Sequence, residues 1–167
     1  METIRKSVTI FPILLLFFHL LPSCHPPEPS GTPELYPVVK VVDGDTFWVD
    51  DGSEKGLKVR LIGVDAPETR KSSRKETGYF GIESKDYLTE LLLGNEVRLE
   101  HDVDRRDKYG RTLAYVYLED GTFVNAELLR NGFAMVMTVP PNVRFAEEFL
   151  ELQKDARDGH RGLWRSD

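Results

Sequence analysis

The chain of 167 residues contains only one cysteine, Cys24. A single thiol excludes an intramolecular disulfide and any zinc site built from several cysteines. The chain also has no excess of positive charge, because 22 Lys and Arg stand against 28 Asp and Glu, which gives a formal net charge of -6. This balance argues against a protein that coats nucleic acid through bulk positive charge. An enzyme whose positive charge is confined to one cleft remains compatible with this net charge.

The sequence contains no internal repeat. Its composition is 40% hydrophobic and 30% charged. These values are ordinary for a folded soluble protein. They exclude a disordered acidic tail, a collagen, a coiled coil and a membrane protein with many spans. The length predicts about one globular domain.

Residues 1–24 have the pattern of an export signal. Two basic residues precede the apolar run 10–21, which is too short to span the core of a bilayer. Leu21-Pro-Ser-Cys24 follows and resembles a bacterial lipobox, which predicts lipidation of Cys24. The alternative is an ordinary signal peptide with an incidental cysteine. We therefore expect an exported protein, either a cell-envelope lipoprotein that contacts the membrane through its N-terminal lipid or a secreted protein.

Residues 25–37 form a predicted linker that contains five prolines. Proline at this density favours an extended polyproline II conformation over a packed core. The folded domain is therefore expected over residues 38–167.

Hydrophobic periodicity in the remaining chain predicts an α+β domain. Alternating or β-branched runs predict five strands, and two longer amphipathic patterns and a shorter one predict three helices. The strands are expected at 38–42, 46–49, 57–62, 96–100 and 113–118, and the helices at 79–94, 124–130 and 145–159. A small five-stranded Greek-key barrel with helices outside it is one solution for this order of elements.

The first segment with chemical potential is Asp43-Gly-Asp45-Thr. Two carboxylates flank a glycine, and a hard cation such as Ca²⁺ prefers carboxylate and carbonyl oxygens on a bent backbone. In isolation the segment is more typical of a plain turn, since Asp and Gly favour turns for other reasons.

The second segment runs from Arg60 to Glu68 and includes Asp65 and Pro67. The arginine lies near the end of a predicted strand, and the two carboxylates follow it closely. A surface ion pair, which stabilises a protein little, is the simpler interpretation. Pro67 favours a functional one, because it fixes the backbone and gives each carboxylate its own direction.

The third segment is Asp107-Lys-Tyr-Gly-Arg111. A guanidinium at the start of a strand matches phosphate oxygens with two parallel hydrogen bonds. A charged hairpin loop is the alternative when the segment is taken alone. None of the four histidines is near the three segments, which argues against a histidine or zinc mechanism.

Together the segments resemble the staphylococcal-nuclease-like family, the thermonucleases. That family shows the patterns D-G-D-T, R-x₄-D-x-P-E and D-K-Y-G-R in this order. The resemblance covers residues 38–164 and implies a five-stranded OB-fold β-barrel with three helices. It also implies a Ca²⁺-dependent phosphodiesterase that cuts DNA and RNA, which we expect to be a monomer.

The resemblance further implies how a metal ion would be held. Asp45 and Asp65 would ligate Ca²⁺ through their carboxylates, and Ala66 through its backbone carbonyl. Asp43 would not touch the metal but would bind a water molecule that is bound to it.

The resemblance assigns the remaining matched residues to the substrate. Arg60 and Arg111 would bind the phosphate and stabilise charge in the transition state, and Glu68 would orient or deprotonate the attacking water. Lys108 and Tyr109 would contact the neighbouring phosphate.

One stretch departs from the family pattern. Some members carry a pair of stacking tyrosines there, whereas residues 135–141 contain none. Met135 and Met137 would offer a softer platform or belong to the core. A basic loop at 70–75 would attract a polyanion or form a solvated loop, and both interpretations can hold.

Two other functions compete with the nuclease. A non-catalytic OB-fold module would bind nucleic acid or protein, and an envelope structural lipoprotein would use the barrel as a scaffold. The chain retains both arginines and Glu68, which favours catalysis over either alternative.

Overall fold

The structure, a computed structural model, describes residues 34–69 and 79–165. The expectations for the export signal, for Cys24, for the linker up to residue 33 and for the basic loop 70–75 lie outside these residues.

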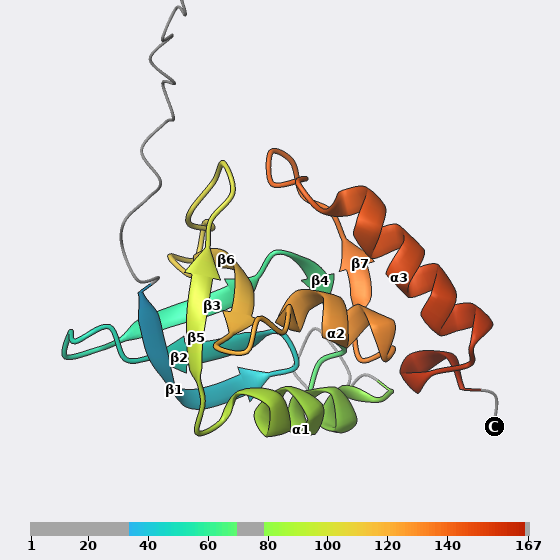
Figure 1. Cartoon of the computed structure of the whole chain (residues 1–167), viewed down its shortest axis with the longest axis horizontal. Helices are drawn as coiled ribbons and strands as arrows, with labels where there is room; N and C mark the ends of the chain where they lie inside the picture. Colours follow the sequence, from blue (N-terminus) through green and yellow to red (C-terminus); the bar gives the residue numbers. More distant parts are fainter. Residues whose placement is uncertain (1–33, 70–78, 166–167) are drawn as a thin grey trace, which may run out of the picture. The chain divides into compact units, whose positions relative to one another are not determined.

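Five strands close into a barrel in the order β1-β2-β3-β6-β5 (Figure 1). All neighbours are antiparallel except β3 and β6, which pair in parallel. Their bounds are β1 Leu35–Asp43, β2 Thr46–Val49, β3 Leu57–Leu61, β5 Glu96–Glu100 and β6 Thr112–Leu118. The closed barrel and three helices confirm the predicted α+β, OB-fold architecture.

Alternation along the strands produces the core. Phe47, Val49, Val59, Val97 and Val116 all point inward and are completely buried. Burial of apolar side chains from each strand stabilises closure of the barrel, and β-branched residues suit the pleated surface.

Strand β1 begins three residues earlier than predicted. Leu35, Tyr36 and Pro37 pair with β5, so these residues belong to the barrel and not to the linker. The prolines that suggested a linker did not exclude a strand end here, because Pro37 still uses its carbonyl to accept a hydrogen bond from the Asp50 N–H at 2.9 Å.

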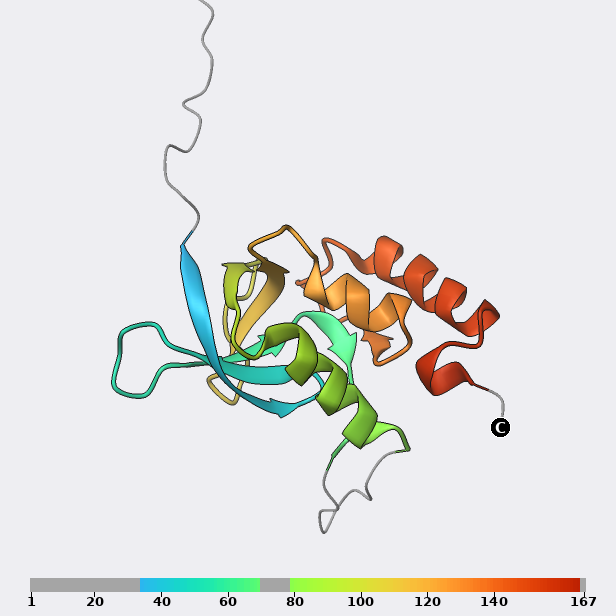
Figure 2. The same ribbon diagram turned by 60° about the horizontal axis from the view of Figure 1, so that its bottom comes forward.

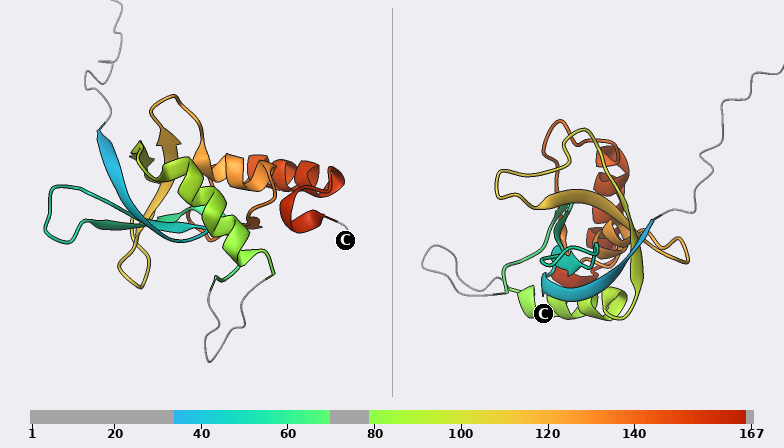
Figure 3. Two further views of the ribbon diagram at one scale, coloured as in Figure 1. Left: turned by 90° about the horizontal axis from the view of Figure 1, so that it is seen from below. Right: turned by 90° about the vertical axis from the view of Figure 1, so that its left-hand side faces the viewer.

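Three α-helices flank the barrel, namely α1 Gly81–Leu92, α2 Val124–Arg130 and α3 Ala146–Asp158. Helix α1 packs along β1 (Figure 2), and Ser84, Leu88 and Leu92 form its buried face, as the periodicity predicts. Helices α2 and α3 pack against each other on another side (Figure 3). A short 3₁₀ helix, Gly162–Trp164, ends the domain. None of the helices in the described part of the chain is long and apolar enough to cross a membrane.

A second, two-stranded sheet was not predicted. It pairs β4 Gly63–Asp65 with β7 Met135–Met137. Gly63 has a φ of 78°, and a Cβ there would lie 2.6 Å from the Phe149 ring. Only glycine combines that backbone conformation with so close an approach of α3. The small sheet places Asp65 beside Met135, at the edge of the barrel.

A buried asparagine ties α2 to the barrel. Asn125 is 0% exposed, and its side chain accepts a hydrogen bond from the Val116 N–H at 2.9 Å and donates one to the Ile62 carbonyl at 2.8 Å. It therefore fixes β6 and the connection between β3 and β4 in one arrangement.

Replacement Asn125→Ala should lower the free energy of unfolding, because it leaves a buried N–H and a buried carbonyl without partners. Each orphaned group costs about 1–3 kcal/mol. Urea denaturation measures the change. Asn95→Ala is the matched control, since the Asn95 amide donates only to the exposed Leu91 carbonyl, and its effect should stay within about 0.5 kcal/mol. Equal losses in the two variants would contradict this account.

Candidate active site

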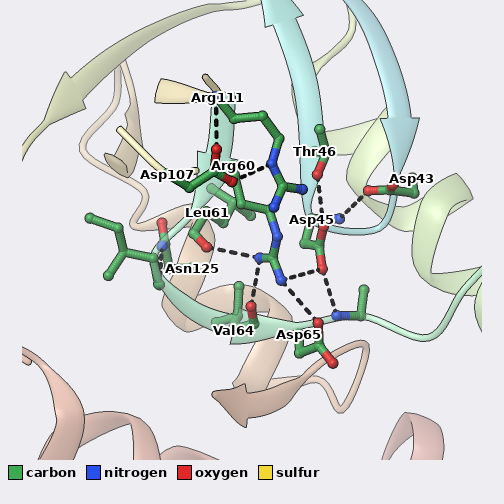
Figure 4. Close-up of polar contacts among 12 residues, drawn as sticks. Asp43, Asp45, Thr46, Arg60, Leu61, Val64, Asp65, Asp107, Arg111 and Asn125 are labelled. Carbon is green, nitrogen blue, oxygen red and sulfur yellow. Dashed lines mark hydrogen bonds and ion pairs between the residues drawn. The ribbon is translucent and has the colours of Figure 1, made fainter. Parts of the chain in front are cut away.

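Residues from all three sequence segments line one pocket of about 310 Å³ beside β3 (Figure 4). It is lined by Asp43, Asp45, Arg60, Asp65, Ala66, Pro67, Glu68, Tyr109, Arg111 and Met137. Of the residues predicted for the site within the domain, only Lys108 lies outside this lining. It lines an adjoining cavity of about 630 Å³ instead.

The turn between β1 and β2 delivers Asp45 to the pocket. A Cβ on Gly44 would lie 2.6 Å from the Ala66 Cβ and 2.9 Å from the Ser84 Cβ. The glycine therefore lets the turn pack against both α1 and the segment after β4. In that position the Asp45 carboxylate accepts the Ala66 N–H at 2.9 Å.

Arg60 occupies the centre of the site and is buried, with 6% of its surface exposed. Its Nη1 donates to the carbonyls of Leu61 at 2.9 Å and Val64 at 2.7 Å. Its Nη2 lies 2.9 Å from an oxygen of Asp65 and 3.1 Å from one of Asp45 (Figure 4). The simpler interpretation of a surface ion pair is therefore wrong, because the backbone and two carboxylates together hold the guanidinium in place.

Burial raises the pKa of Asp45 to about 7, although the charge of Arg60 opposes this rise. The nearby Asp43 carboxylate raises the pKa further. A further positive charge in the pocket would favour the ionised form of Asp45.

The oxygen atoms of the pocket fit a hard cation. Asp45 and Asp65 place carboxylates on the two sides of the Arg60 Nη2, and the backbone of Ala66 lies beside Asp45. In residues 34–69 and 79–165, no three His, Cys, Asp or Glu side chains gather as a metal site. A cation here would therefore need backbone and water oxygens besides the two carboxylates, which Ca²⁺ with its 6–8 oxygen ligands accepts.

Arg111 reaches the pocket from the start of β6, next to Arg60. The parallel pairing of β3 and β6 sets Val59 opposite Thr112, so Arg111, the residue before β6, lies beside the strand that carries Arg60. The Arg111 Nε donates to the Asp107 carboxylate at 2.6 Å. The terminal nitrogens of Arg111 make no hydrogen bond in the part of the chain that the structure describes.

Asp107 opens the third segment, but the sequence alone assigned it no role. Desolvation raises the pKa of its carboxyl, but hydrogen bonds from the side chain and N–H of Arg111 and from the Tyr109 N–H outweigh it and lower the pKa. Asp107 thus orients Arg111 and shapes the loop. An aspartate that opens a tight turn was the available signal.

The loop after Asp107 presents its other predicted residues to solvent. Tyr109 is 72% exposed, and the Lys108 Nζ lies 5.1 Å from the centre of its ring. Met135 and Met137 are each 40% exposed, and Met137 lines both the pocket and the adjoining cavity. Of the two alternatives for these methionines, the one that places them in the core is therefore wrong, and Met137 lines the site.

Glu68 lies on the outer wall of the pocket, after Pro67. A Cβ on Gly81 would lie 2.3 Å from the Glu68 carbonyl, so the first residue of α1 packs directly against this backbone. Helix α1 thereby fixes where the Glu68 segment passes the site.

Comparison with known proteins agrees with this geometry. The family described as Staphylococcal nuclease homologue matches residues 58–166. A thermonuclease from Staphylococcus hyicus is 35% identical over 162 residues, 94% of this chain and 94% of that protein. A thermonuclease from Staphylococcus intermedius is 38% identical over 170 residues, 98% of this chain and 99% of that protein. Endonuclease YncB from Bacillus subtilis (strain 168) is 38% identical over 127 residues, 75% of this chain and 59% of that protein.

The family match spans more than half of the chain and includes Arg60, Asp65, Glu68 and Arg111. The two staphylococcal relatives extend the similarity over nearly the whole sequence. The chain therefore belongs to the staphylococcal nuclease family and is a nuclease, a hydrolase of that family.

Proposed function

We propose that this nuclease depends on Ca²⁺ and hydrolyses phosphodiester bonds of both DNA and RNA in the 310 Å³ pocket. The observation that carries the proposal is the convergence of two arginines and several carboxylates from separate segments in that pocket. A phosphodiester is an anion that repels hydroxide and releases an alkoxide poorly. Its hydrolysis needs positive charge around the phosphoryl oxygens and a base for the attacking water.

Arg60 and Arg111 supply the positive charge. The carbonyls of Leu61 and Val64 fix the Arg60 guanidinium, so little reorganisation is needed when charge develops on the phosphate. Asp107 holds Arg111 through Nε, which leaves its terminal nitrogens for the equatorial oxygens. Lys108 and Tyr109, which follow Asp107, would contact the neighbouring phosphate.

Glu68 orients the attacking water or removes its proton. Glu68 lines the pocket and is exposed to solvent, from which water enters. All these groups come from one chain, so the proposed site needs no residue from a second copy.

Ca²⁺ would be held by Asp45, Asp65 and the Ala66 carbonyl. Asp43 would contact water bound to the ion. When bound, the ion supplies Lewis acid polarisation of the phosphoryl group and neutralises part of its charge. The two carboxylates already share one guanidinium, so they lie close enough to serve a common ligand.

Arg111→Ala and Glu68→Gln should each lower kcat for single-stranded DNA by about 10²–10³, since each removes one aimed catalytic group. Steady-state hydrolysis at saturating Ca²⁺ measures the loss. Arg130→Ala is the control, because Arg130 lies on α2 outside both cavities and pairs with Glu127. Wild-type rates in a folded Arg111→Ala protein would place the active site elsewhere.

Arg60→Ala is a less clean test of the same site. It leaves two carboxylates without their partner, and breaking a buried pair costs about 3–5 kcal/mol of stability. Its activity therefore needs to be compared at a temperature where unfolding measurements show the variant folded. Asp45→Ala should instead raise the Ca²⁺ concentration required for half-maximal rate.

We also propose that the enzyme is exported and that Cys24 is lipidated. The support is the sequence alone: an apolar run after two basic residues, followed by the lipobox-like Leu21–Cys24. A lipid there, followed by the proline-rich linker, would tether the nuclease to the cell envelope.

Metabolic labelling with a radioactive fatty acid should mark the wild-type protein and not a Cys24→Ala variant. The variant should leave the membrane fraction, because a protein without acyl chains has no stable anchor. Unlabelled wild-type protein whose N-terminus starts beyond Cys24 would favour plain secretion. That result would leave the catalytic proposal untouched, since its residues all lie after position 38.

A further inference from the structure

The cavity of about 630 Å³ adjoins the catalytic pocket and is larger than it. The two share Arg60, Tyr109, Arg111 and Met137 as lining residues. A polymer whose phosphate lies between the two arginines therefore continues directly into this cavity.

Part of the lining of the larger cavity is apolar. Leu113, Val139, Pro140 and Met137 contribute to them, and Val139 is 57% exposed. Such walls suit the nucleoside part of a nucleotide, whereas its phosphates need donors at the rim.

Arg106 is such a donor at the rim. It lines the cavity and is exposed, and its backbone bridges to Thr112 at the start of β6, which fixes its place. Within the described residues, its guanidinium forms no ion pair and no hydrogen bond. Asp104 lines the same cavity without pairing to it, and the Asp107 carboxylate is engaged by Arg111.

The neighbouring Arg105 differs in one respect. Of residues 104–109, only Arg105 does not line the cavity. Two exposed arginines therefore stand side by side in the sequence, and only one faces the cavity.

We propose that Arg106, together with Lys108 and Tyr109, binds the backbone phosphate beyond the nucleotide that occupies the larger cavity. The inference rests on the proposed function, because the cavity takes a nucleotide only if the scissile phosphate lies at Arg60 and Arg111. A guanidinium fork matches phosphate oxygens, and at the solvent-exposed rim it reaches the backbone of a strand whose base lies against the apolar wall. Arg106 makes the enzyme favour a longer single strand over a dinucleotide.

Binding of a fluorescein-labelled 12-nucleotide oligothymidylate tests the contact without catalysis. Fluorescence anisotropy is recorded in chelator over a series of salt concentrations. Arg106→Ala should weaken binding by about tenfold at low salt, the effect of one charged hydrogen-bonded contact. The slope of log K against log salt should fall by about 0.7, the contribution of one phosphate contact on a single strand.

Two matched variants separate this contact from general charge. Arg106→Lys should keep the salt slope, because it retains the cation. Arg105→Ala removes the same charge one residue away and should change binding by less than about twofold, with no change in slope. Equal effects of Arg105→Ala and Arg106→Ala would overturn the proposal.

Kinetics with Ca²⁺ supply the second measurement. For the wild type, KM should be lower for the 12-nucleotide strand than for a thymidine dinucleotide, and Arg106→Ala should remove most of that difference by raising KM of the longer strand. An unchanged length dependence in Arg106→Ala would also overturn the inference. A wild-type protein that binds the oligonucleotide through Arg106 but never cleaves it would refute the proposed function alone.

Discussion

The Arg60 guanidinium is the interaction on which the rest of the site depends. It joins the end of β3 to the Leu61 and Val64 carbonyls and to the carboxylates of Asp45 and Asp65. These groups come from the β1–β2 turn, from β3 and from β4, so one side chain sets the spacing of three separate segments. Burial of that charge is tolerated because two carbonyl oxygens and two carboxylate oxygens lie 2.7–3.1 Å from its nitrogens.

An acidic chain handles a polyanion here by concentrating its cations. The net charge is -6, yet Arg60, Arg106, Lys108 and Arg111 all line the two connected cavities. Six acidic residues line the same cavities, and the arginines engage three of them: Arg60 pairs with Asp45 and Asp65, and Arg111 pairs with Asp107. Asp107 pairs with Arg111 and, among the described residues, with none of the other three cations.

Much of the fold follows from the sequence, because β-branched alternation and helical periodicity extend over enough residues to be recognised. The β4–β7 sheet does not, since three-residue strands such as Met135–Met137 carry no periodic signal. The three motifs predicted which residues meet, but they did not predict the burial of Arg60, and the sequence left open whether Met137 lies at the site or in the core. Both depend on the small sheet that folds over the edge of the barrel.

The central claim is that Arg60, Arg111, Glu68 and the carboxylates of Asp45 and Asp65 form one cation-dependent hydrolytic site. The most direct measurement is the rate at which the purified full-length chain degrades single-stranded DNA and RNA with Ca²⁺, with Mg²⁺ and with chelator. An all-oxygen site built from two carboxylates and a carbonyl prefers the larger and more flexibly coordinated ion. The account predicts hydrolysis of both polymers with Ca²⁺, much slower hydrolysis with Mg²⁺ and none in chelator. Equal hydrolysis in chelator and in Ca²⁺ would contradict it.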